Sequence, residues 1–171
     1  MNRKIRALTK AAGTRERRYR TLAELKKVLI LCENADRKTV EACARTLTAM
    51  KKTVYLCIYV RKQENIPVWD QNCLPVNAEK DINLWGFPNN ALLHQFYHLP
   101  ADMLLDLTGS VCPTMRYLML LHPSSFKVGA KRAAEDDLYD FSIVMNDDVY
   151  DLSFLFKQVM NYLQVIRAGN S

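Results

Sequence analysis

The segment from residue 101 to 131 constrains the fold of this chain more than any other; it reads ADMLLDLTGSVCPTMRYLMLLHPSSFKVGAK. An apolar run at 103–107 ends at a glycine-containing turn at 108–110. An apolar helix is then expected at 113–121, opened by a proline, and a second short strand at 125–129. A strand–helix–strand unit of this length predicts two parallel strands joined by a right-handed crossover.

Strands and helices alternate along the rest of the chain as well. Further strands are expected at 27–32, 53–60, 74–76 and 138–145, and capped helices at 36–50, 89–97 and 150–167. We therefore expect an α/β fold, a single three-layer Rossmann-like domain with a mostly parallel sheet of five or six strands, over residues 21–171. A basic N-terminal helix over residues 1–20, called the arm below, precedes this domain.

Positive charge is concentrated at the start of the chain. Residues 1–27 hold ten Lys or Arg and two Glu, a charge of +8, while the rest holds 14 basic and 16 acidic residues, a charge of −2. This asymmetry predicts an anionic partner for the arm, such as RNA or a ribosomal surface. The residues expected to contact that partner are Arg3, Lys4, Arg6, Lys10, Arg15, Arg17, Arg18 and Arg20.

Two other uses of the arm fit the same residues. A solvated helix that only improves solubility accounts for the charge equally well. A membrane-surface helix is less favoured, because the narrow apolar stripe of Ile5, Leu8 and Ala12 lacks the Trp and Phe that anchor such helices.

A candidate ligand site lies where the strand at 103–107 ends and the next helix begins. Backbone N–H groups at such a helix start can bind a phosphate or a carboxylate, although Thr108 or Ser110 can equally well cap the helix. Lys127 is expected at the end of the neighbouring strand, where it borders the same cleft or forms a structural ion pair with Asp106. The candidate ligand-binding residues are Asp106, Thr108, Gly109, Ser110, Lys127 and Gly129.

No catalytic frame, metal site or cofactor motif is predicted. The sequence contains neither G-x-G-x-x-G, nor a P-loop, nor G-x-S-x-G. His94 and His98 have the spacing of zinc ligands but no acidic or thiol ligand close by in the sequence. Trp69 and Trp85 are expected to pin the proline-rich segment 66–90 to the core rather than to stack on a base or sugar.

The compartment follows from what the sequence lacks. No apolar run approaches the roughly 18–20 residues that a membrane helix needs, and no signal peptide precedes the domain, so we expect a cytoplasmic protein. The five cysteines form no C-x-x-C pair, and buried reduced thiols are expected.

Short motifs along nearly the whole chain resemble an uncharacterised family of Bacteroidota, a domain of unknown function. They are Pro67-x-Trp69, Lys80-Asp81-x-Asn83-x-Trp85-Gly86, the strand 102–107, Ser124-Ser125-Phe126-Lys127-Val128-Gly129, Tyr139-Asp140 and Tyr162-Leu163, together with the basic arm. The resemblance implies a small cytoplasmic α/β protein without an assigned activity.

A weaker likeness concerns glycosyltransferases. Asp106-Leu107-Thr108-Gly109 and Lys127-Val128-Gly129 resemble the N-terminal half of heptosyltransferase-type enzymes, which need a second Rossmann domain to hold a nucleotide sugar. The sequence as a whole therefore favours a non-catalytic binding module that uses its arm. The alternative is a binder or enzyme acting on a small phosphorylated or nucleotide-like ligand at the carboxyl edge of the strands.

Overall fold

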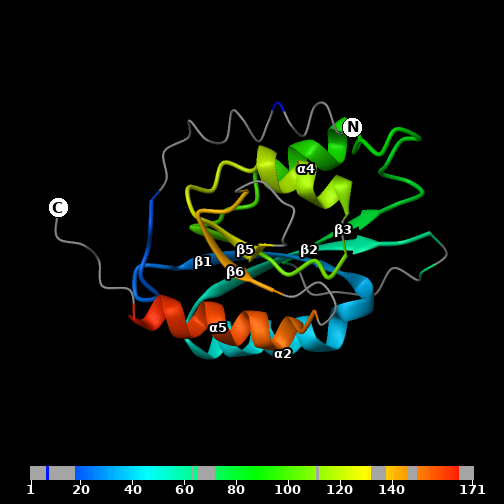
Figure 1. Cartoon of the computed structure of the whole chain (residues 1–171). Coiled ribbons are helices and arrows are strands. Elements are labelled where there is room, and N and C mark those ends of the chain that lie inside the picture. Colours follow the sequence, from blue (N-terminus) through cyan, green and yellow to red (C-terminus); the bar gives the residue numbers. More distant parts are fainter. Residues whose placement is uncertain are drawn as a thin grey trace.

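A computed structural model of the chain is drawn in Figure 1. The structure describes residues 7, 18–62, 64, 72–110, 112–131, 138–145 and 150–165. Most of the arm, including the expected helix, therefore lies outside the described residues.

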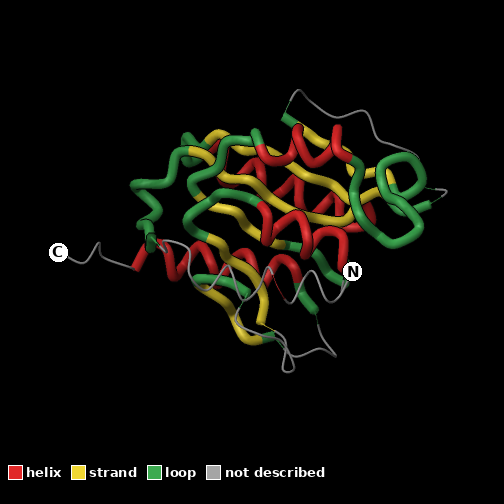
Figure 2. The backbone as a smooth tube through the Cα atoms, turned by 90° about the horizontal axis from the view of Figure 1, so that it is seen from above, coloured by secondary structure: helices red, strands yellow, loops and turns green. Residues whose placement is uncertain are grey.

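One parallel sheet forms the centre of the molecule. Its strands are β1 (Lys27–Glu33), β2 (Thr53–Val60), β3 (Cys73–Asn77), β4 (Met103–Asp106), β5 (Lys127–Lys131) and β6 (Phe141–Val144). They lie side by side in the order β3-β2-β1-β4-β5-β6, and each neighbouring pair is parallel (Figure 2). The predicted parallel sheet is confirmed, and its order is the one found in doubly wound dinucleotide-binding sheets.

Helices cover both faces of this sheet, which makes three layers (Figure 1). Helices α2 (Arg37–Ala49) and α5 (Leu152–Val165) lie on one face, with the short 3-10 turn η1 (Asn34–Asp36) leading into α2. Helices α3 (Asn90–Tyr97) and α4 (Pro113–Leu121) lie on the other. All four start and end within a few residues of the positions that the sequence predicts.

The central strand β1 explains the most apolar run in the sequence. Val28, Ile30 and Cys32 pack toward α2 and α5, whereas Leu29 and Leu31 pack toward α3 and α4, and all five are fully buried. A strand covered on both faces needs apolar residues at every position, so it reads as a continuous run rather than an alternation.

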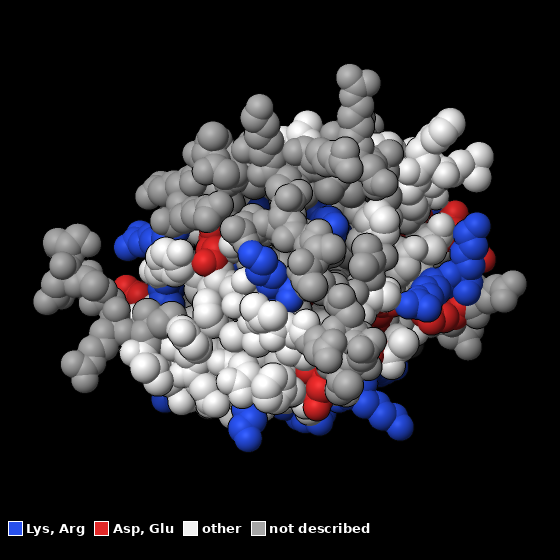
Figure 3. Space-filling model, viewed as in Figure 1, with Lys and Arg blue, Asp and Glu red and all other residues white. Residues whose placement is uncertain are grey.

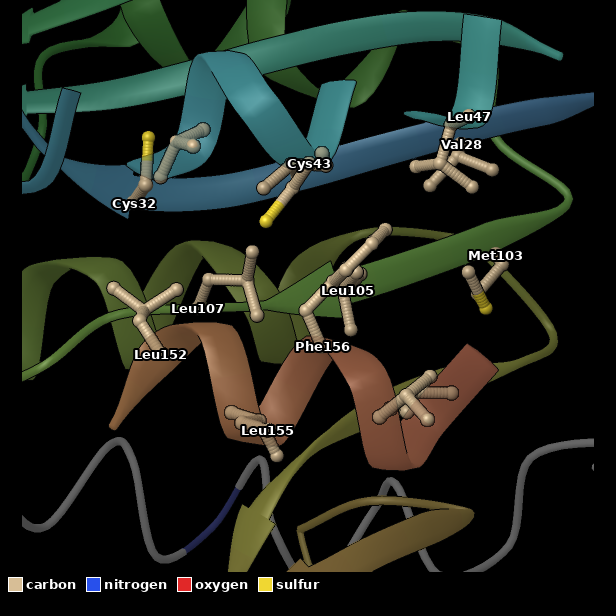
Figure 4. Packing of buried hydrophobic residues seen from close by; sticks show 14 of the residues in the cluster. Val28, Cys32, Cys43, Leu47, Met103, Leu105, Leu107, Leu152, Leu155 and Phe156 are labelled. Atoms are coloured by element: carbon tan, nitrogen blue, oxygen red, sulfur yellow. The ribbon is translucent and has the colours of Figure 1, made fainter. Parts of the chain in front are cut away.

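A large cluster of apolar side chains forms the core on the α2/α5 face (Figure 4). Leu47 of α2 lies beside Val28 of β1 there, and Phe156 of α5 lies beside Leu105 of β4. The amphipathic spacing of both helices places one such side chain on the sheet at every turn.

The other face is closed by shorter helices. Asn89 caps α3, since its Oδ1 accepts the N–H of Leu92 at 2.8 Å, which confirms a predicted cap. Phe96 of α3 and Leu118 of α4 fill the core on this side.

The last two strands differ from the prediction. We expected strands at 125–129 and 138–145, but β5 begins at Lys127 and β6 only at Phe141. Tyr139 leaves the sheet and lies over Gly129, at which an added Cβ would be 2.5 Å from the tyrosine ring. Where β5 and β6 begin, the Asp140 carboxylate accepts the N–H of Lys127 at 2.7 Å. A side chain of one segment thus binds the backbone of the other at the point where the two strands start.

Candidate functional site

The carboxyl ends of β1 and β4 meet where the strand order of the sheet reverses. β1 ends at Glu33 and β4 at Asp106, and both side chains are buried, with 2% and 6% of their surface exposed. Open parallel sheets bind ligands in the crevice outside this point of reversal. Only Leu107 separates Asp106 from the turn 108–110, so four of the predicted site residues reach this edge: Asp106, Thr108, Gly109 and Ser110.

Asp106 binds groups of its own chain. Its Oδ1 accepts the N–H of Thr108 at 2.9 Å and the hydroxyl of Thr108 at 2.7 Å, and its Oδ2 accepts the Tyr139 hydroxyl at 2.7 Å. Burial raises the pKa of Asp106 above its usual value, although these hydrogen bonds oppose the shift. The N–H and the hydroxyl of Thr108 are thus both bound to the carboxyl group of Asp106.

Glu33 occupies the donors of Ser110. The Ser110 N–H donates to Glu33 Oε1 at 2.9 Å, its hydroxyl donates to the same oxygen, and Arg61 Nη2 donates to Oε2. Burial alone would raise the pKa of Glu33, but the bonds from Ser110 and Arg61 outweigh it and lower the pKa. Glu33 is not among the residues predicted from the sequence, although a carboxylate directly after five buried apolar residues is a usable signal.

Gly109 completes the turn beside a third carboxyl group. An added Cβ at this glycine would lie 3.4 Å from Asp36 Oδ2 and 3.7 Å from the Tyr150 ring. Burial raises the pKa of Asp36, and the charge of Glu33 raises it further. The crevice is therefore lined by acidic groups, which do not favour binding of an anion; the ligand role of the turn stays a prediction.

Two of the predicted ligand residues do not join this turn. Lys127 begins β5 rather than ending it, and its fully buried side chain donates from Nζ to the Leu120 carbonyl at 3.2 Å. Gly129 is covered by the Tyr139 ring, which accounts for a glycine at that position. The expected pairing of Lys127 with Asp106 is thus replaced by contacts of each residue with other groups.

A cleft of about 1040 Å³ lies beside the crevice, at the end of β2. Tyr59 and Arg61 line one wall, Leu84 and Gly86 another, and Thr114 in the first turn of α4 a third. The Thr114 hydroxyl donates to the Gly86 carbonyl at 3.0 Å, which fastens the loop to the helix.

The same loop corrects the expectation for Trp85. Trp85 is 78% exposed and Leu84 is fully exposed, so this tryptophan does not pin the segment to the core. Asn83 holds the loop instead, because its Oδ1 accepts the N–H groups of Trp85 and Phe87, both at 3.0 Å. Phe87 supplies the apolar anchor by packing edge-on against Tyr117. Trp69 lies outside the described residues.

The arm joins the domain at the opposite edge, where the strands begin. The Arg18 N–H donates to the Ser125 carbonyl at 3.2 Å, and the Tyr19 ring packs edge-on against Phe126. Arg20 Nη1 lies 4.0 Å from Asp102 Oδ1. The six other predicted contact residues lie outside the described residues: Arg3, Lys4, Arg6, Lys10, Arg15 and Arg17.

Comparison with known proteins supports the predicted kind of family. Residues 1–166 match the Family of unknown function (DUF6913). The chain belongs to DUF6913. No curated protein and no solved structure matches this DUF6913 chain, so its likeness to glycosyltransferases stays a prediction.

The other candidate groups of the DUF6913 chain are the two histidines of α3 and the cysteines. Within the described ranges, no three His, Cys, Asp or Glu side chains converge as metal ligands, and His98 Nδ1 contacts the His94 carbonyl at 2.7 Å. All five cysteines are free thiols, and burial raises the pKa of Cys32 and Cys57 well above the usual value. None of the described helices is long and apolar enough to cross a membrane.

Proposed function

We propose that this DUF6913 chain is a non-catalytic binding module whose basic arm contacts an anionic partner such as RNA or a ribosomal surface. The observation that carries the proposal is the distribution of charge: residues 1–20 hold eight Lys or Arg and one Glu. From residue 28 onward the chain has a charge of −2, so the domain itself has no such excess. Polyanions attract basic segments over long distances and without a defined pocket.

The root of the arm supports the same interpretation. Tyr19 and Arg20 fix the start of the domain at the edge where the strands begin, away from the acidic crevice around Glu33 and Asp36. Arg18, Tyr19 and Arg20 thus lie at the edge opposite these carboxylates, which would repel a polyanion. Arg20 is itself held near Asp102, so we expect it to anchor the arm more than to bind phosphate.

The alternative, a small phosphorylated ligand at the carboxyl edge, receives less support. The N–H groups of Thr108 and Ser110 would have to release Asp106 and Glu33 before they could bind a phosphate. A buried carboxylate that loses its donors is strongly destabilised, which works against that exchange.

A pair of charge variants tests the proposal. In the first, Arg3, Lys4, Arg6 and Lys10 are replaced by Gln; in the matched control, four exposed cations of the α2/α5 side, Lys38, Arg45, Lys51 and Lys157, are replaced by Gln. Both variants lose four charges, and the four side chains changed in the control are exposed. Binding to a labelled single-stranded RNA is measured by fluorescence anisotropy over a series of salt concentrations.

We expect the wild-type affinity to fall steeply with salt, because bound phosphates release counterions. The wild type should then have a negative slope when the logarithm of the association constant is plotted against the logarithm of the salt concentration. The arm variant should reduce the size of this slope by about 0.7 for each phosphate that it no longer neutralises, and the control variant should change it little. Equal reductions in both variants would indicate attraction by net charge alone, and no binding at low salt would exclude RNA as the partner.

A further inference from the structure

The solvent side of α5 has an unusual composition for an exposed helix. Only one of its 14 residues, Lys157, is charged, and its exposed positions include large apolar side chains. Phe154 is 47% exposed, Tyr162 54% and Val165 77%. Figure 3 shows a largely uncharged surface in the lower part of the molecule, where α5 lies in Figure 1. Few charges and many aromatic groups are the composition of interface cores.

Two of these aromatic residues form a stripe with the partly buried Gln158. Phe154, Gln158 and Tyr162 follow one another at intervals of four residues, so they lie on the same side of the helix. The buried residues of α5, such as Leu155 and Val159, face the sheet instead. The stripe is symmetric about Gln158, with one aromatic ring four residues before it and one four residues after it.

This symmetry identifies the partner that the stripe fits. When two copies of α5 pack antiparallel about a two-fold axis at Gln158, residue n of one copy meets residue 316−n of the other. Phe154 then meets Tyr162 of the second copy, and Tyr162 meets its Phe154, which gives two aromatic pairs across one interface. The two Gln158 amides face each other at the axis and can exchange hydrogen bonds.

Charge and the edge of the sheet point to the same partner. A face with one cation can meet a copy of itself without a cluster of like charges. The outermost strand β6 lies against this helix, since the Phe141 ring packs on Tyr162 with centroids 4.7 Å apart. A second copy would thus extend contact from α5 toward an edge strand, which natural proteins seldom leave uncovered.

We propose that the chain forms a two-fold homodimer in which α5 packs antiparallel against α5 of a second copy, with Gln158 at the axis. The proposal does not depend on the arm or on its partner. It assigns Phe154 and Tyr162 as the anchors of the interface, since about half of each side chain is exposed in a single copy.

Sedimentation velocity of the full chain tests the assembly. The wild type should have about twice the mass of one 19.7 kDa chain. The double variant Phe154→Glu/Tyr162→Glu should raise the dissociation constant at least about 100-fold, because it buries charge at both anchors of each copy. The matched control Leu84→Glu/Trp85→Glu changes two exposed apolar residues elsewhere and should leave the dimer intact.

Cross-linking tests the axis itself. The Gln158→Cys variant carries one new thiol in each copy, and under mild oxidation by diamide these two thiols should form one disulfide, with diamide accepting the two electrons and two protons. The side chain in a Lys157→Cys variant points about 100° away around the helix, so this variant should cross-link far more slowly. A monomeric wild type at every concentration, a dimer insensitive to the Phe154/Tyr162 change, or faster cross-linking at residue 157 would each overturn the proposal.

Discussion

The two faces of the sheet are closed in different ways. On one face, α2 and α5 are 13 and 14 residues long, and they pack on a large apolar cluster. On the other, α3 and α4 have only eight and nine residues, and the chain adds Leu138 and Tyr139 to the cover. Buried ionisable groups lie on this second side, among them Glu33, Asp106, His122 and Lys127.

The comparison shows that the length of the covering helices determines which interactions close a face of the sheet. Where long helices cover the strands, burial of apolar surface is sufficient, and it tolerates changes of pH. Where helices are short, irregular segments must be fixed by hydrogen bonds, and each buried polar group must find its partner. We therefore expect the α3/α4 face to carry most of the pH dependence of stability and the tightest packing constraints.

His122 should produce the largest of these effects. Its Nε2–H donates to the Leu99 carbonyl at 3.0 Å, and its Nδ1 accepts the N–H of Ser124 at 3.1 Å, so the ring is neutral in the folded chain. Burial lowers the pKa of His122 to about 4. The stabilisation is complete above the unfolded pKa of 6.5 and is lost as the pH falls toward 4, a change of about 3 kcal/mol.

Urea unfolding at several pH values measures this loss. The free energy of unfolding of the wild type minus that of His122→Gln should shrink by about 3 kcal/mol between pH 7 and pH 4. The same measurement on His94→Gln, at an exposed ring, serves as the matched control, and the general titration of carboxylates cancels in both differences. A difference for His122→Gln that does not change with pH would contradict the prediction that protonation of His122 destabilises the folded chain.

Gly129 should produce the next largest effect. An added methyl group at Gly129 would lie 2.5 Å from the Tyr139 ring, so Gly129→Ala must displace the tyrosine and should cost about 2 kcal/mol. At Gly109 the nearest atom would be 3.4 Å away, and Gly109→Ala should cost much less. Thermal unfolding of the two variants gives the comparison, and equal costs would contradict it.

Tyr139 itself should have the smallest effect of the three. Tyr139→Phe keeps the ring over Gly129 but removes the hydroxyl that donates to Asp106 Oδ2. The carboxylate keeps both donors of Thr108, so we expect a loss of only about 1 kcal/mol at neutral pH. The loss should decrease in acid, where Asp106 takes up a proton; Tyr97→Phe, at an exposed ring, serves as control.

The sequence predicted the elements whose signal lies within one segment. The run from Val28 to Cys32 identified a buried strand, and Asn89 identified the start of α3, because burial and capping act between near neighbours in the chain. The predicted strand starts at residues 125 and 138 were wrong. They depend on contacts between the two segments, in which Asp140 binds the N–H of Lys127 and Tyr139 covers Gly129, and neither segment shows these contacts by itself.

The candidate site also depends on contacts between segments that are far apart in the sequence. Ser110 and Glu33 are 77 residues apart, and nothing in either segment indicates that the carboxylate takes the donors of the turn. A glycine-containing turn after a parallel strand looks like a phosphate cradle until its partners are known. Trp85 was expected inside because of its size, but the bonds of Asn83 hold its loop without it.

One backbone contact near the root of the arm decides how a dimer would present its arms. The N–H of Leu22 donates to the carbonyl of Leu163, so each arm leaves the domain beside the last turn of α5. Antiparallel α5 helices place these last turns at opposite ends of the interface, about 20 Å apart for a helix of 14 residues. The roots of the two arms would then lie apart at the two ends of the interface rather than side by side, so the dimer would offer its partner two separate attachment points.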